Sequence, residues 1–71
     1  RLTDMLFLGF RLSEGVDMTA VAQRFGVDVW TRWGRQLAPF VDAGLVARDR
    51  SRLRLTRSGM LLANEVMQVF V

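Results

Sequence analysis

Side chains that could carry covalent or metal chemistry are scarce in this sequence. Its 71 residues include no His, Cys or Tyr, and all ten basic residues are Arg. A Ser hydroxyl would therefore have no neighbouring base to activate it, and a thiolate metal site is impossible. The carboxylates are spread singly along the chain, with no ligand-dense loop and no Gly-rich phosphate loop. The sequence therefore predicts no catalytic, cofactor-binding or metal-binding residue in this chain.

Arginines form two local groups in a chain whose net charge is +3. Arg32 and Arg35 lie close together, and five more arginines fall between Arg48 and Arg57. Clustered arginines suit contacts to phosphate groups. They equally suit a solvated hairpin, because charged side chains keep an edge strand from pairing with other molecules. We favour the second interpretation.

The stretch from Gly44 to Gly59 predicts the element around which the rest is arranged. Leu53 and Leu55 alternate with arginines, which is the period of a strand with one buried face. A polar, turn-forming tip separates this run from Leu45-Val46-Ala47, so we expect a β-hairpin over about Leu45–Leu55. Thr56 is expected to cap a single helix that begins at about Arg57 and runs to the end of the chain.

Three helices are predicted before the hairpin. The first spans the apolar run Leu2–Leu12, the second follows the capping residue Asp17, and the third follows Asp28. Pro39 lacks an N–H group, and its ring clashes with the carbonyl four residues back. We therefore expect a break or kink in the third helix between Gly34 and Pro39.

These elements predict one small domain, residues 1–71, that is mainly α with a small β-hairpin. The arrangement is winged-helix-like, with three helices, a two-stranded antiparallel wing and a C-terminal helix. No apolar run is as long as a membrane span. Because the chain begins with Arg1 rather than Met, we expect it to be part of a longer protein.

One function open to such a fold is nucleic-acid binding by a transcription regulator. Arg32 and Arg35 would then face the nucleic acid from the third helix, with Arg50 and Arg52 of the hairpin along the backbone. However, Arg32 occupies a position that usually holds an inward aliphatic residue, and Pro39 interrupts the same helix. Any binding by this domain is therefore expected to be weak and dominated by electrostatics.

Six short stretches together indicate a protein family more specifically than the hairpin alone does. They are Leu8-Gly9-Phe10-Arg11-Leu12, Glu14-Gly15-Val16-Asp17, Arg24-Phe25-Gly26, Ala43-Gly44-Leu45-Val46, Leu53-Arg54-Leu55-Thr56-Arg57-Ser58-Gly59 and Ala63-Asn64-Glu65-Val66. In this order the chain resembles the C-terminal domain of oxygen-independent coproporphyrinogen III oxidase-like radical SAM proteins, a group that includes heme chaperones. The resemblance covers nearly the whole chain.

The resemblance implies a cytoplasmic parent protein with an N-terminal radical SAM barrel. In that barrel, cysteines bind a [4Fe–4S] cluster that cleaves S-adenosylmethionine, and the parent acts as an oxidoreductase or carries heme. None of those cysteines is present here, so no cofactor residue is carried over to this chain. What the resemblance implies for this chain is an accessory domain that docks on the barrel and helps to cover the porphyrin or heme site.

The first helix is the expected docking element. A helix turns by about 100° per residue, so its many apolar side chains cannot all face one small core. We expect Phe7 and Phe10 to leave an apolar patch on the surface, with Arg11 beside it to hydrogen-bond a partner. The sequence supports equally well the competing interpretation that these side chains are part of the core.

Overall fold

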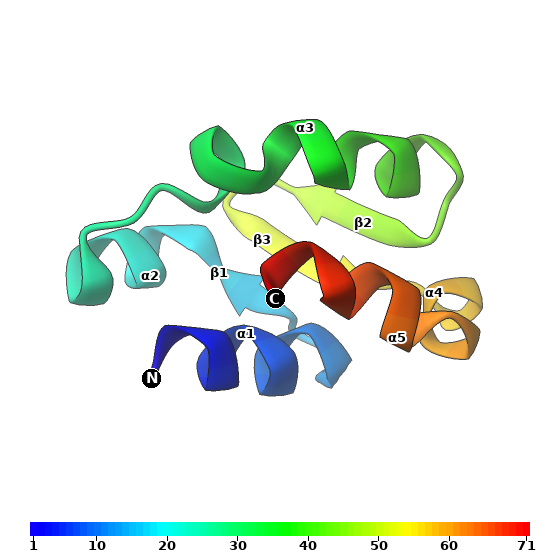
Figure 1. Ribbon diagram of the computed structural model, residues 1–71, viewed down its shortest axis with the longest axis horizontal. Coiled ribbons are helices and arrows are strands. Elements are labelled where there is room, and N and C mark those ends of the chain that lie inside the picture. Colours follow the sequence, from blue (N-terminus) through cyan, green and yellow to red (C-terminus); the bar gives the residue numbers. More distant parts are fainter.

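The computed structural model describes all 71 residues, Arg1 to Val71, as helices around a small sheet (Figure 1). In chain order the elements are α1 (Leu2–Arg11), β1 (Val16–Asp17), α2 (Met18–Phe25), α3 (Val29–Asp42), β2 (Val46–Asp49), β3 (Arg52–Leu55), α4 (Arg57–Leu61), α5 (Ala63–Met67) and the 3-10 helix η1 (Gln68–Phe70). The predicted class, mainly α with a small β-hairpin, is confirmed.

The sheet has a third strand that the sequence did not predict. Its order is β1-β3-β2, and both pairings are antiparallel. Val16 lies opposite Leu53, and Val46 lies opposite Leu55, so these four apolar side chains share the buried face. The predicted two-stranded hairpin is present as β2 and β3, and β1 extends it to three strands. Two residues are too few to show the alternating pattern from which a strand is recognised.

Gly15 explains how β1 comes so close to β3. Its φ is +73°, and a Cβ atom there would collide with the carbonyl oxygen of Leu53. Only glycine combines that left-handed backbone with so close an approach to a neighbouring strand. The sequence signal for β1 is thus the glycine before it rather than the strand residues themselves.

The core is built around Phe70 at the end of the chain. Its ring centroid lies 5.2 Å from that of Phe10 and 5.0 Å from that of Trp33, the latter pair edge to face. Both distances are typical of favourable aromatic pairs. In Figure 1, the segment α5–η1 runs in front of the sheet with α1 and α3 on either side of it. Phe70 therefore joins the first helix, the third helix and the chain end in one cluster.

Three side chains cap helices as predicted. Oδ1 of Asp17 accepts the backbone N–H groups of Thr19 and Ala20, with N···O distances of 3.0 and 3.4 Å. Oδ1 of Asp28 likewise accepts the N–H of Thr31 at 3.0 Å. Thr56 Oγ1 accepts the N–H of Gly59 at 3.0 Å. Each cap satisfies a donor that the helix itself leaves free.

Of the break or kink predicted between Gly34 and Pro39, the break does not occur, because α3 is helical without interruption from Val29 to Asp42. Proline removes a hydrogen bond to the carbonyl four residues earlier, which here belongs to Arg35. Arg35 and Pro39 are both exposed, so water can satisfy the freed carbonyl. The cost of the proline is therefore reduced by its position on the solvent side of the helix.

The single C-terminal helix predicted from about Arg57 is also wrong. Leu62, with φ −118° and ψ 29°, separates α4 from α5. Gly59 of α4 is buried against the carbonyl of Leu45, where a Cβ atom would collide with that oxygen. The break lets α4 keep this close contact while α5 and η1 turn to bring Phe70 into the core.

Candidate docking surface

The apolar residues of α1 divide between a buried face and an exposed face. Leu6 and Phe10 are completely buried, whereas the exposed fractions of Leu8 and Leu12 are 69% and 61%. The expected exposure of Phe10 is therefore wrong, because its ring packs against Phe70. An exposed apolar patch does exist, and it consists of Leu8 on α1 and Leu12, the residue that follows the helix.

The other two predicted docking residues, Phe7 and Arg11, also belong to α1. Phe7 is partly buried and packs against the core. Arg11 is exposed, and its Nη1 donates to the carbonyl oxygen of Phe7 at 3.2 Å. That bond uses one of the five N–H donors of the guanidinium group. Arg11 therefore keeps donors that are open to a partner, whereas Phe7 offers only part of its ring.

A groove between α1 and β1 extends the patch. Its volume is about 350 Å³, and Leu8 and Leu12 lie along it. The remaining lining residues are Met5, Gly9, Gly15, Val16, Asp17 and Arg52. At Gly9 an added Cβ would lie 2.7 Å from a methyl carbon of Val16, so the glycine lets α1 approach β1 closely. The groove is thus apolar along most of its length.

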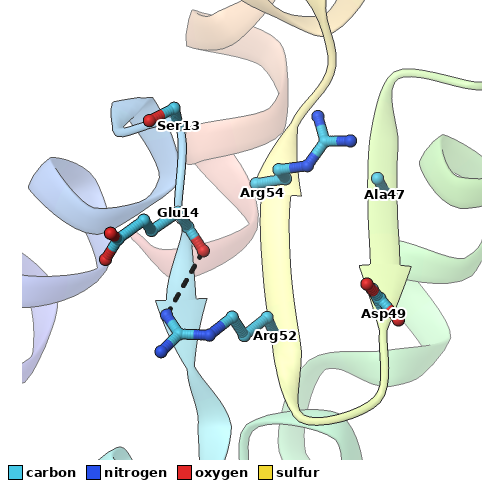
Figure 2. Close-up of a pocket in the computed structure, with 6 residues that line it drawn as sticks. All are labelled: Ser13, Glu14, Ala47, Asp49, Arg52 and Arg54. Atoms are coloured by element: carbon cyan, nitrogen blue, oxygen red, sulfur yellow. Dashed lines mark hydrogen bonds between the residues drawn. The ribbon is translucent and has the colours of Figure 1, made fainter.

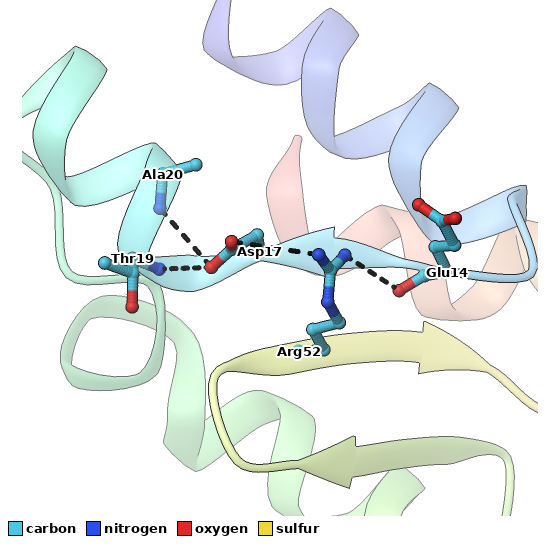
Figure 3. Close-up of polar contacts among 5 residues, drawn as sticks. All are labelled: Glu14, Asp17, Thr19, Ala20 and Arg52. Atoms are coloured by element: carbon cyan, nitrogen blue, oxygen red, sulfur yellow. Dashed lines mark hydrogen bonds and ion pairs between the residues drawn. The ribbon is translucent and has the colours of Figure 1, made fainter.

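Two residues of the groove lining, Asp17 and Arg52, belong to a small polar cluster (Figure 3). Arg52 Nη1 donates to the carbonyl oxygen of Glu14 at 3.4 Å, and Nη2 lies 4.0 Å from a carboxylate oxygen of Asp17. Asp17 is the residue that also caps α2. Both members of this ion pair are substantially exposed, so the pair itself adds little stability. Its role in the geometry is to connect β3, β1 and the start of α2.

The arginines of the nucleic-acid hypothesis come from α3 and from the hairpin. Arg32 and Arg35 are exposed on α3, and the Arg32 guanidinium lies 4.9 Å from the Trp33 ring centroid. Arg50 lies at the hairpin tip with φ 57°. Arg52 instead faces Asp17. Of the four, Arg52 is the one that has an acidic partner.

The open face of the sheet carries charges of both signs. Arg52 and Arg54 alternate with the buried leucines of β3, so they lie on the face away from the core (Figure 2). A cavity of about 380 Å³ there is also lined by Glu14 and Asp49. The mixture of carboxylates and guanidinium groups gives this cavity no strong preference for an anion. The structure also contains no cluster of His, Cys, Asp or Glu that could hold a metal ion.

The sequence predicted exposed apolar side chains on this helix, but it chose Phe10, which is buried, and missed Leu8 and Leu12. Leu8 and Leu12 are four residues apart, and so are Leu6 and Phe10. Either pair fits one side of a helix equally well. The deciding information is the contact between Phe10 and Phe70, which are far apart in the sequence. No local pattern could have supplied it.

Comparison with known proteins identifies the family of this chain. The family model described as the HemN C-terminal domain matches residues 1–62. The chain belongs to this family. The predicted resemblance to the C-terminal domain of HemN-like radical SAM proteins is confirmed by this match. No solved structure matches the chain significantly.

Two curated relatives of this HemN C-terminal domain are both named heme chaperone HemW. The protein from Bacillus subtilis (strain 168) is 30% identical over 71 residues, and that from Lactococcus lactis subsp. lactis (strain IL1403) is 27% identical over the same length. The match covers 100% of this chain and 19% of each relative. In this chain, no helix is both long enough and apolar enough to cross a membrane.

Proposed function

We propose that this domain is the non-catalytic C-terminal accessory domain of a HemN-like radical SAM protein of the heme-chaperone type. It docks on the catalytic barrel of the same chain and helps to cover the porphyrin or heme site. The observation that carries this proposal is the exposed apolar pair Leu8 and Leu12 beside the groove between α1 and β1. Exposed apolar patches on small domains commonly mark interaction surfaces.

The relatives argue for a partner within the same polypeptide. This chain spans 19% of their length, so most of each relative is available to cover the groove. The name of both relatives, heme chaperone, favours heme delivery over the oxidase reaction. The barrel of a cytoplasmic parent would supply the [4Fe–4S] cluster and bind S-adenosylmethionine, since this chain has no Cys to hold a cluster. This domain contributes packing and coverage, not chemistry.

Amide hydrogen exchange on the full-length parent tests the docking. Replacing Leu8 and Leu12 with Asp introduces two charges into the proposed interface, where an unpaired charge is costly. We expect faster exchange in the peptides that cover α1 and β1, together with unchanged exchange in the hairpin strands of the core. The matched control is Leu61→Asp, because Leu61 is 85% exposed and lies on α4 outside the groove.

The outcome separates docking from a surface that remains open in the parent. If the double variant and the control give the same exchange around α1 as the unmodified protein, the groove is not covered by the barrel. A covered groove would instead give slow exchange in the parent and fast exchange in the double variant alone.

A further inference from the structure

Arg48 is held in place by an aromatic ring from another element. Its guanidinium carbon lies 4.2 Å from the ring centroid of Trp30, so the contact links β2 to the start of α3. The other two such contacts, Arg24 with Phe25 and Arg32 with Trp33, join neighbours in the sequence and are longer. Stacking on an aromatic face orients the planar guanidinium group while its N–H edge remains available.

Gly34 provides the space in which Trp30 lies. A Cβ atom added at Gly34 would stand 3.0 to 3.1 Å from three atoms of the Trp30 indole ring. The indole therefore lies against the helix backbone at Gly34, one turn further along α3. Trp30 in turn supports Arg48. This arrangement restricts the arginine before any ligand arrives, which lowers the entropy lost on binding.

Neither Arg48 nor Arg50 has an acidic partner in the structure. The two ion pairs involve the N-terminus with Asp4 and Arg52 with Asp17. Asp49 lies between the two arginines in sequence, but it pairs opposite Arg52 and lines the cavity on the other side of the sheet. The hairpin tip thus presents two guanidinium groups without a compensating carboxylate from the hairpin.

A groove of about 340 Å³ lies beside these arginines. Met18, Ala22 and Trp30 give it an apolar part, and Arg48 and Arg50 give it a basic part. Asp28 also lines the groove, but its carboxylate accepts the N–H of Thr31 at the N-terminus of α3. The helix N-terminus offsets part of that negative charge. The groove therefore suits a ligand with an apolar body and carboxylates at its edge.

We infer that Arg48 and Arg50 bind the propionate carboxylates of a porphyrin whose apolar edge enters this groove. The inference rests on the proposed function, which supplies the ligand class. The groove is near the lower limit of small-molecule sites, which occupy about 300 to 1,000 Å³, so it receives one edge of the macrocycle and leaves the remainder to the barrel. Arginine suits this role because its planar fork pairs with a carboxylate through two parallel hydrogen bonds.

The test compares hemin with hemin dimethyl ester on the full-length parent. The ester keeps the metal and the macrocycle but lacks both carboxylates. In the unmodified protein we expect tighter binding of hemin. In the double variant Arg48→Gln, Arg50→Gln we expect hemin affinity to fall about tenfold, as for the loss of a charge-assisted hydrogen bond, with ester affinity unchanged. The control Arg35→Gln, Arg57→Gln removes the same charge from exposed positions outside the groove and should bind both ligands as before.

Trp30→Leu tests the supporting stack separately. It keeps both arginines and an apolar side chain but removes the aromatic face under Arg48. We expect it to reduce the preference for hemin over the ester by a smaller factor than the double variant does. Circular dichroism of each variant verifies that the fold is retained.

Several results would overturn the inference. One is an unmodified protein that binds hemin and its ester equally, and another is a double variant that keeps the full preference. A third is a double variant that loses binding to an oligonucleotide instead of hemin, which would make the hairpin a phosphate-binding element. The exchange experiment on α1 is independent of all three, so loss of the docking proposal and loss of this inference can be distinguished.

Discussion

The two faces of α1 have nearly the same composition but differ strongly in solvent exposure. Leu6 and Phe10 are fully removed from solvent, whereas Leu8 on the same helix and Leu12, the residue that follows it, remain more than half exposed. The difference arises from distant parts of the chain, because Phe70 packs against one face and nothing in this chain covers the other. Apolar character therefore serves two purposes here, stabilising the domain on one face and offering a contact surface on the other.

This comparison makes stability measurements informative. A residue that belongs to the core should change the free energy of unfolding strongly when truncated. A residue kept for a partner should change it little.

The largest effect is expected at Phe10. Phe10→Ala removes a fully buried ring that packs against Phe70, and such truncations cost about 3 to 5 kcal/mol. A domain of this size has little stability to spare, so the variant should be largely unfolded at room temperature. Urea denaturation followed by circular dichroism measures the change.

Phe7→Ala is the matched control for this prediction. It removes the same side chain from a partly buried position on the same helix, so it should lower the free energy of unfolding by clearly less. Equal losses at the two positions would mean that the division of α1 into two faces is incorrect.

Local signals in the sequence were sufficient for most of the fold. The caps at Asp17, Asp28 and Thr56 and the alternation of Leu53 and Leu55 depend on residues a few positions apart, and the structure confirms them. Such features are decided by hydrogen-bonding needs and side-chain direction within one or two turns. They predicted the hairpin and the starts of α2, α3 and α4.

The features that were missed depend on distant contacts. The pairing of β1 with β3, the break at Leu62 and the burial of Phe10 each require knowledge of a partner far along the chain. The contact between the Arg48 guanidinium group and the Trp30 ring likewise joins residues that are distant in the sequence. For the candidate docking site, the sequence could name the helix but not the face.

An intermediate effect is expected at Asp17, where the polar end of the groove meets the start of α2. Asp17→Ala removes the cap from Thr19 and Ala20 and the ion pair with Arg52. Loss of an N-cap costs about 1 kcal/mol, and the exposed ion pair adds little to that. Asp17→Asn, measured by the same urea titration, keeps a capping oxygen and should retain most of the stability. If Asn is as harmful as Ala, the ion pair rather than the cap is the important interaction.

The smallest effect on stability is expected on the exposed face of α1. Leu8→Ser and Leu12→Ser remove apolar surface that is already 69% and 61% exposed in this domain. Exposed substitutions usually change the free energy of unfolding by less than about 0.5 kcal/mol, and Ser is only slightly poorer than Leu in a helix. Urea denaturation of this chain should therefore barely distinguish these variants from the unmodified protein. In the full-length parent the same substitutions remove area from the proposed interface, so they should speed amide exchange around α1. A loss of several kcal/mol in the isolated chain would show that Leu8 and Leu12 stabilise the domain itself. The outer face of α1 would then be a second part of the core, and the contrast between its two faces would no longer identify a docking surface.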